Sequence, residues 1–166
     1  MDNQKELFPI VDEEGRVIGS IDRGHAHDGT KILHPVVHLH LFNSHGDLYL
    51  QKRPIWTDIQ PGKWDTATGG HVDYGEAVAD ALRREVREEL GVTDFEARYL
   101  TRYIFEGKRE RELVYVYTTV YDGEVTPNPK ELAGGRFFSK EEIENHMGKD
   151  FFTPNFEDEY KKIFVD

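Results

Sequence analysis

The chain contains no cysteine, which excludes disulfide bonds, thiolate metal sites and cysteine nucleophiles. It also lacks an apolar run of the roughly 18–20 residues that a membrane-spanning helix needs. No N-terminal stretch has the basic-then-apolar layout of a secretory signal. From these absences we expect a cytoplasmic protein that has no membrane partner.

Positive charge is scarce, because 21 Lys and Arg residues face 32 Asp and Glu residues and leave a net charge of −11. The average field of such a chain repels long polyanions, so we expect no nucleic acid duplex as a partner. A small phosphate compound can still bind where metal ions and a few arginines reverse the local charge. The 166 residues suit a single domain over residues 1–166, either as a monomer or as a homodimer.

Turn-forming residues divide the chain into short elements. We expect paired strands over residues 8–12 and 16–21, a longer pair over 35–43 and 48–53, and a loop over 55–70. A helix over 76–90 should end at Gly91, and strands should follow over 98–105, 112–121 and 136–138. Ser139 and Glu142 form a capping box for a helix over 141–147, and a terminal helix should cover 155–165. This order predicts an α+β fold with a sheet covered by helices.

The helix over 76–90 carries carboxylates among its apolar residues. On a wheel that advances about 100° per residue, one stripe contains Val78, Ala81, Leu82, Val86 and Leu90. Glu85 and Glu89 fall inside this stripe and Glu88 lies at its edge, whereas the arc facing water holds Asp80, Arg83, Arg84 and Arg87. An unpaired buried carboxylate is costly, so we expect a cation there, and Mg²⁺ prefers oxygen ligands. The alternative is a solvated helix with Glu–Arg pairs on its surface.

The residues around this helix resemble a known motif. Gly70, Glu76 and the run from Arg84 to Val92 match the Nudix box at every defined position. The order of strands, glycine turn and helices extends the resemblance to the Nudix hydrolase superfamily over most of the chain. It implies a Nudix α/β/α sandwich with a mixed sheet and an N-terminal hairpin. It also implies hydrolysis of a small nucleoside diphosphate linked to a group X, or of a related diphosphate, with Mg²⁺ or alternatively Mn²⁺.

Positions in the motif also imply roles. Glu85, Glu88 and Glu89 resemble the metal ligands, joined by the carbonyl of Gly70. Arg84 resembles the arginine that orients a box glutamate. Glu76 resembles the glutamate that braces the loop by bonding either this arginine or a metal-bound water. The general base is either a box glutamate or Glu131, for which an exposed loop acid is the alternative interpretation.

Substrate contacts are less specific. Lys52 and Arg53 resemble basic residues that approach the substrate phosphates, and their charges suit that role, although surface solubility explains them equally well. Tyr74 is a candidate for stacking on a base. The group X is open between a nucleotide sugar, a nucleoside triphosphate and an isoprenoid diphosphate.

The N-terminal two-thirds also resembles the type I isopentenyl-diphosphate isomerases, a branch with the same fold. In that branch three histidines and two glutamates bind a metal, and the matching residues here are His27, His34, His71, Glu110 and Glu112. Such mixed ligands suit Mn²⁺, Zn²⁺ or Mg²⁺. The alternative is that these histidines shape the pocket or contact substrate.

Two departures argue against isomerase activity. Gly69 stands where the isomerases have a catalytic cysteine, and the Nudix box is complete here although the isomerases have an eroded one. We therefore predict a hydrolase on an isomerase-like scaffold, with an isopentenyl-diphosphate isomerase and a non-catalytic nucleotide sensor as the alternatives.

Overall fold

The computed structural model describes residues 6–26 and 29–165. Its strands are β1 Leu7–Val11, β2 Val17–Asp22, β3 Leu33–Phe42, β4 Leu48–Lys52, β5 Trp64–Thr66, β6 Thr68–His71, β7 Arg98–Glu106, β8 Arg111–Val120 and β9 Gly135–Phe138. Its helices are α1 Arg23–Ala26, α2 Val78–Leu90, α3 Lys140–His146 and α4 Pro154–Phe164. These elements confirm the α+β class, and no helix in the described ranges is long and apolar enough to cross a membrane.

Two sheets organise the strands. β1 and β2 form an N-terminal antiparallel pair, as predicted. The mixed sheet has the order β5-β4-β3-β8-β7, with β6 paired to β3 and β9 paired to β4. The long predicted hairpin is confirmed, because β3 and β4 pair antiparallel.

The chain forms two compact units, each made of three separate stretches. The first unit contains Met1–His38, Gly69–Glu85 and Arg98–Tyr117, and the second contains Leu39–Thr68, Val86–Ala97 and Thr118–Asp166. The boundaries fall inside β3, β6, α2 and β8, so these four elements each contribute to both units. The assignment of residues 1–166 to a single domain stays a prediction.

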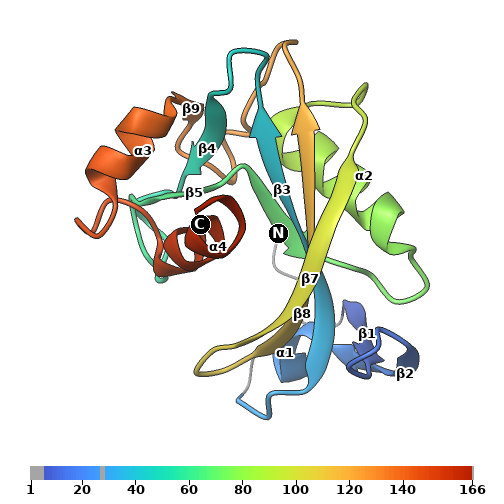
Figure 1. The fold of residues 1–166 in the computed structure, drawn as a ribbon. Coiled ribbons are helices and arrows are strands. Elements are labelled where there is room, and N and C mark those ends of the chain that lie inside the picture. Colours follow the sequence, from blue (N-terminus) through green and yellow to red (C-terminus); the bar gives the residue numbers. More distant parts are fainter. Residues whose placement is uncertain (1–5, 27–28, 166) are drawn as a thin grey trace. The chain divides into compact units, whose positions relative to one another are not determined.

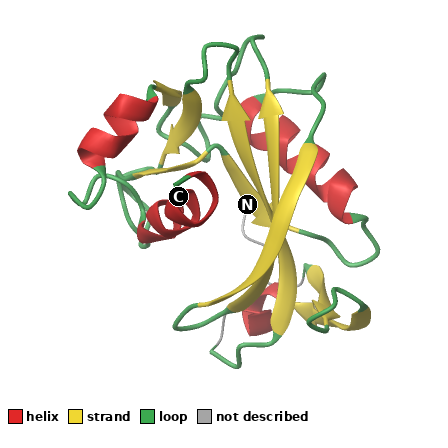
Figure 2. Ribbon diagram, viewed as in Figure 1, coloured by secondary structure: helices red, strands yellow, loops and turns green. Residues whose placement is uncertain are grey.

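The first unit begins with the N-terminal hairpin. Gly15 has a φ of 83° and lies in the turn between the two strands, where a left-handed backbone favours glycine. The carboxylate of Asp12 accepts hydrogen bonds from the backbone N–H groups of Glu14 and Arg16, each at 2.9 Å, and this stabilises the turn. Phe8 and Ile21 are paired across the strands and buried, and α1 lies beside them (Figure 2).

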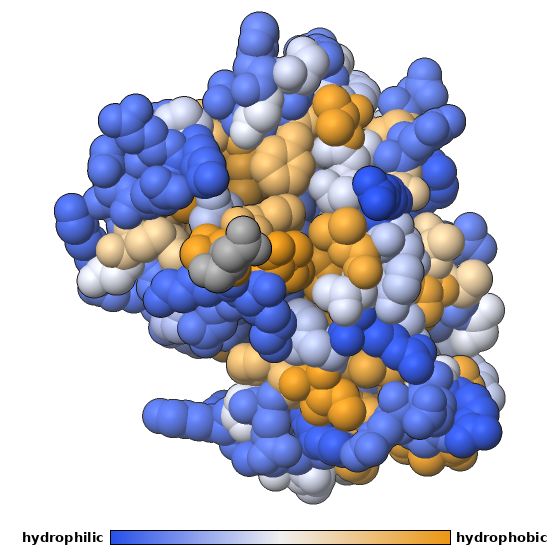
Figure 3. Space-filling view, viewed as in Figure 1, coloured by the Kyte–Doolittle hydropathy of each residue, from blue (hydrophilic) through white to orange (hydrophobic). Residues whose placement is uncertain are grey.

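The second unit is built around β4, which pairs antiparallel with β5 on one edge and β9 on the other. Its core contains Leu48, Leu50, Phe138, Ile143, Phe152, Phe156 and Tyr160. α3 and α4 lie beside these strands (Figure 1). The predicted capping box is confirmed, because the Ser139 side chain accepts from the N–H of Glu142 and the Glu142 carboxylate accepts from the N–H of Ser139. Ile143 is the buried residue of α3, and the side chains on the outer surface of this helix are hydrophilic (Figure 3).

Three parts of the local prediction were wrong. The predicted loop over 55–70 contains β5 and the start of β6, whose hydrogen bonds come from pairing with β4 and β3 rather than from local sequence. α2 begins at Val78 rather than at Glu76. Glu76 instead closes a turn, because its N–H donates to the carbonyl of Asp73 at 3.0 Å and Gly75 adopts a φ of 86°. The short helix α1 was not predicted.

Candidate active site

The glutamates of α2 differ in burial, as the wheel predicted. Glu89 is 8% exposed, the Glu85 side chain is 15% exposed, and Glu88 is exposed at the edge of the stripe. The apolar positions Ala81, Leu82, Val86 and Leu90 are buried beside them. Two carboxylates therefore point where apolar side chains point, and this arrangement needs positive partners.

Arg84 is the positive partner within the first unit. Its Nε and one Nη donate to the two carboxylate oxygens of Glu76 at 2.9 and 3.0 Å. The other Nη donates to Glu85 Oε1 at 2.7 Å, and a further bond at 3.0 Å reaches the carbonyl of His71. The prediction that Arg84 faces water was wrong, because its side chain is only 21% exposed. The helical wheel does not include the 71–76 loop, which supplies two of the acceptors, the Glu76 carboxylate and the His71 carbonyl.

This network shifts the pKa of both charged partners. The hydrogen bonds to Glu76, together with the Glu85 carboxylate, raise the pKa of Arg84 above its usual range despite its burial. Burial alone raises the pKa of Glu76, but the hydrogen bonds from Arg84 and from the Asp73 backbone outweigh it, so this pKa is lowered. Arg84 and Glu76 therefore stay charged at neutral pH and fix one oxygen of Glu85.

Gly70 gives Glu85 the space that it occupies. A Cβ atom at residue 70 would lie 2.2 Å from Cδ of Glu85 and 2.4 Å from its Oε2. Any other residue here would displace the carboxylate. The Glu85 carboxylate thus lies directly against the backbone at Gly70, and both groups offer oxygen atoms, the donor type that Mg²⁺ prefers.

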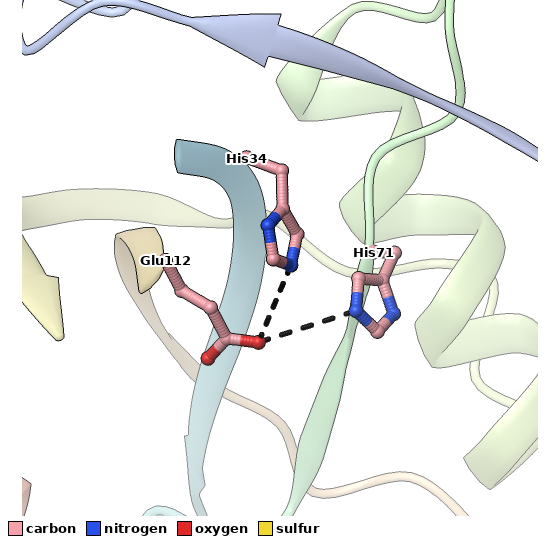
Figure 4. A group of neighbouring side chains, drawn as sticks. All are labelled: His34, His71 and Glu112. Atoms are coloured by element: carbon pink, nitrogen blue, oxygen red, sulfur yellow. Dashed lines mark ion pairs between the residues drawn. The ribbon is translucent and has the colours of Figure 1, made fainter. Parts of the chain in front are cut away.

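A second cluster in the first unit contains His34, His71 and Glu112 (Figure 4). One candidate ligand atom from each residue lies within 4.8 Å of the others. Glu112 Oε2 lies 3.7 Å from His34 Nε2 and 4.0 Å from His71 Nε2. Although burial raises the pKa of Glu112, the adjacent His34 and the positive charge that the neighbouring histidines can carry outweigh it and lower this pKa.

The orientation of His34 in this cluster is set by its other nitrogen. Nδ1 lies 3.0 Å from the carbonyl of Ile32, and a carbonyl only accepts, so Nδ1 carries the hydrogen. In a neutral ring Nε2 then holds a lone pair that faces the Glu112 carboxylate. Two electron-rich atoms that face each other need a proton or a metal ion between them, and a metal-binding histidine has this same tautomer with its second nitrogen hydrogen-bonded.

Two further ligands, His27 and Glu110, were predicted for this cluster. His27 falls outside the described residues. Glu110 is in the turn between β7 and β8, where its carboxylate lies against Gly107 and its carbonyl accepts the Gly107 N–H at 2.8 Å. Its role as a ligand stays a prediction.

In the second unit, the loop between β8 and β9 is hydrogen-bonded both to the end of α2 and to Lys52, which was predicted to approach the substrate phosphates. The N–H of Asn128 donates to the carbonyl of Glu89 at 2.8 Å, and the N–H of Glu131 donates to the carbonyl of Asn128 at 3.1 Å. The N–H of Ala133 then donates to the carbonyl of Lys52 at 2.9 Å. The loop between β8 and β9, in which Glu131 is exposed, thus contacts the end of the box helix through Asn128 and Lys52 through Ala133.

Arg53 is hydrogen-bonded through its side chain, whereas Tyr74 is hydrogen-bonded through its backbone and has an exposed side chain. Arg53 donates from Nε to the carbonyl of Ile59 at 2.9 Å and from Nη2 to the Thr57 hydroxyl at 3.3 Å, so its guanidinium holds the loop after β4. Tyr74, in the first unit, is 52% exposed, and its backbone N–H donates to the carbonyl of Leu7 at 2.9 Å. Their contacts with substrate stay predictions.

Sequence reasoning missed two polar residues of these networks. Asp73 lies 3.6 Å from Arg84, and burial together with a hydrogen bond to Glu6 raises its pKa to about 6. Gln51 is buried on β4 and donates to Glu89. The available signal for Gln51 was a polar side chain inside an otherwise apolar strand.

Known proteins are similar to this chain in sequence. The NUDIX domain family model matches residues 32–158. An uncharacterized Nudix hydrolase of Pseudomonas aeruginosa is 36% identical over 82% of this chain and 80% of its own length. Isopentenyl-diphosphate Delta-isomerase 1 of Photorhabdus laumondii is 29% identical over 95% of this chain and 94% of its own.

A solved structure extends the likeness to the fold. The crystal structure of DR0079 from Deinococcus radiodurans superposes with a TM-score of 0.82 at 25% identity and covers 96% of this chain and 99% of its own. This likeness confirms the predicted Nudix fold. Because the family model spans most of the sequence, the chain belongs to the Nudix family and is a Nudix hydrolase.

Proposed function

We propose that this enzyme hydrolyses the phosphoanhydride bond of a small nucleoside diphosphate–X or related diphosphate compound, with Mg²⁺ or Mn²⁺ bound by the α2 glutamates. The observation that carries the proposal is the inward position of Glu85 and Glu89 on the apolar side of α2. Arg84 bonds one oxygen of Glu85, and both carboxylates offer oxygen atoms of the type that hard divalent cations prefer. A divalent cation is the partner that a diphosphate substrate also needs.

The residues fit such a cation. Glu85, Glu88 and Glu89 offer carboxylate oxygens from adjacent turns of one helix, and Gly70 leaves room for Glu85 against the backbone. When bound, the cation neutralises phosphate charge and lowers the pKa of water. Arg84 and Glu76 hold Glu85 in place, so that little reorganisation is needed when substrate arrives.

Proton transfer and substrate binding involve the remaining residues. The water that attacks phosphorus must lose a proton to a nearby carboxylate, either a box glutamate or the exposed Glu131. Lys52 offers a positive charge for the phosphates, and Tyr74 offers an exposed ring for a base or sugar. Arg53, whose guanidinium also holds the loop after β4, offers a second positive charge for the phosphates.

A substrate screen tests the proposal. The purified chain would be incubated with Mg²⁺ and a panel of nucleotide sugars, nucleoside triphosphates, dinucleotides and isoprenoid diphosphates, and the released phosphate and nucleoside monophosphate would be measured. We expect turnover of at least one compound that stops when EDTA removes the cation. If no compound in the panel released phosphate or nucleoside monophosphate, the result would favour the nucleotide sensor instead.

We also propose that His34, His71 and Glu112 hold a second divalent ion. Nitrogen ligands favour Co²⁺, Zn²⁺ or Mn²⁺ over Mg²⁺. Glu112→Gln keeps the shape but removes the charge, and we expect it to weaken Co²⁺ binding by roughly tenfold or more. Absorption titration with Co²⁺ in the absence of substrate measures this, with His45→Asn on the exposed β3–β4 turn as the matched control. Equal Co²⁺ affinity in Glu112→Gln would show that a proton, rather than a metal, bridges the cluster.

The same cluster favours a second candidate function, isomerisation of isopentenyl diphosphate, because several relatives are named isopentenyl-diphosphate Delta-isomerases. The absence of cysteine opposes it, since Gly69 offers no group for proton transfer. Incubation with isopentenyl diphosphate separates the two functions. We expect no dimethylallyl isomer, and its formation would replace hydrolysis as the proposed activity.

A further inference from the structure

We propose that Gln51 is a positioning residue that fixes the carboxylate of Glu89 for cation binding, an inference that rests on the proposed role of Glu89. Gln51 lies on β4 with only 8% of its surface exposed. Its Nε2 lies 3.1 Å from Glu89 Oε1 and 3.2 Å from the carbonyl oxygen of Ala67. All three residues belong to the second unit.

The two acceptors determine how the Gln51 amide is oriented. The Ala67 carbonyl has no hydrogen to donate, so the part of the amide that faces it must be the NH₂ group. The NH₂ group has two hydrogens, one for Ala67 and one for Glu89. Gln51 therefore acts as a donor to Glu89 and cannot present its own oxygen there without losing the bond to Ala67.

The bond to Ala67 anchors this donor to the sheet. Ala67 is fully buried and lies between β5 and β6, and β5 pairs with β4 at Gln51 and its neighbours. A buried amide is costly unless it is hydrogen-bonded, and an apolar side chain would pack at this position without that cost. The polar residue is therefore explained by what it bonds, which is the carboxylate of a box glutamate.

A neutral donor suits a cation ligand better than a charged one. Arginine or lysine at this position would cancel the negative charge of Glu89 and compete with a cation for it. The amide of Gln51 instead restrains one carboxylate oxygen and leaves the charge intact. Gln51 therefore restrains Glu89 without adding a positive charge that would compete with a cation.

Mn²⁺ titration without substrate tests this inference. Binding would be followed by electron paramagnetic resonance in a Glu112→Gln background, in which binding by the histidine cluster is weakened. Gln51→Leu, which has a similar volume, should weaken Mn²⁺ binding by roughly tenfold or more, and it should lower kcat more than it raises KM. Gln51→Asn, which is too short to reach both acceptors, should reproduce the effect if the leucine variant does not fold.

Thr119→Val is the matched control, because Thr119 is 4% exposed and its hydroxyl donates a hydrogen bond to the carbonyl of Glu96 at 2.6 Å. It should lose stability but keep Mn²⁺ affinity. Unchanged affinity in both Gln51 variants, with weakened affinity in Glu89→Gln, would overturn the role of Gln51 alone. Unchanged affinity in Glu89→Gln as well would overturn the cation site itself.

Discussion

Replacing Glu89 with glutamine should reduce kcat by a factor on the order of 10²–10⁴. Glutamine keeps the size of the side chain and its hydrogen-bonding oxygen, but it removes the charge that the proposed cation requires. KM should change less than kcat, because Glu89 contacts no substrate atom in the proposed arrangement. Steady-state kinetics with Mg²⁺, on a substrate identified by the screen, would measure both constants.

The fold should tolerate this change. Glu89 is buried and shares its helix face with Glu85 at the i,i+4 spacing, where like charges repel by a few tenths of a kcal/mol. We therefore expect the cation-free Glu89→Gln protein to unfold at the same or a higher urea concentration than the wild type. Asp80→Asn removes an exposed carboxylate from the same helix and should leave kcat unchanged. Normal turnover in Glu89→Gln would remove Glu89 from the site.

Arg84→Met should lower the free energy of unfolding by about 2–3 kcal/mol at pH 7. Breaking a buried ion pair costs roughly 3–5 kcal/mol because it leaves the partner charge unpaired, and the partial exposure of Arg84 reduces that figure. Glu76 and Glu85 would both lose their charged donor. Arg84→Lys should restore only part of the loss, since lysine cannot form the paired bonds to Glu76. Urea unfolding would measure all three proteins.

The pH dependence of this loss has a defined sign. The pKa of Glu76 is lowered from 4.5 in the folded protein, so its stabilising contribution is fully present above pH 4.5 and is lost as the pH falls through the lowered value. The difference in stability between wild type and Arg84→Met should therefore be largest at neutral pH and shrink below about pH 4.5. A difference that stays constant down to pH 3 would show that Arg84 stabilises the fold by packing rather than by pairing.

Local signals in the sequence predicted much of the fold and the main elements of the site. The stripe of α2, the left-handed Gly91 at its end and the capping box of Ser139 each depend on residues within a few positions of one another. Hairpins are equally local, because a short turn joins the paired strands. The inward positions of Glu85 and Glu89 follow from the same local signal, whereas the role of the box acids as ligands stays a prediction.

Contacts between distant residues could not be predicted in this way. β5 exists because Trp64–Thr66 pairs with β4, and its own sequence is bounded by Pro and Gly residues that indicate a loop. Arg84 is on the polar side of the wheel, but a loop supplies its acceptors. Gln51 is 38 residues from Glu89, and no periodicity connects the two.

The most direct test of the central claim is Mn²⁺ binding to the substrate-free protein, measured in a Glu112→Gln background with and without the further changes Glu85→Gln and Glu89→Gln. If the inward carboxylates of α2 hold a divalent ion, the background protein will show a saturable site and the variant that also lacks both charges will lose it. Equal binding by the two proteins would contradict the claim, because the ion would then be held by other groups.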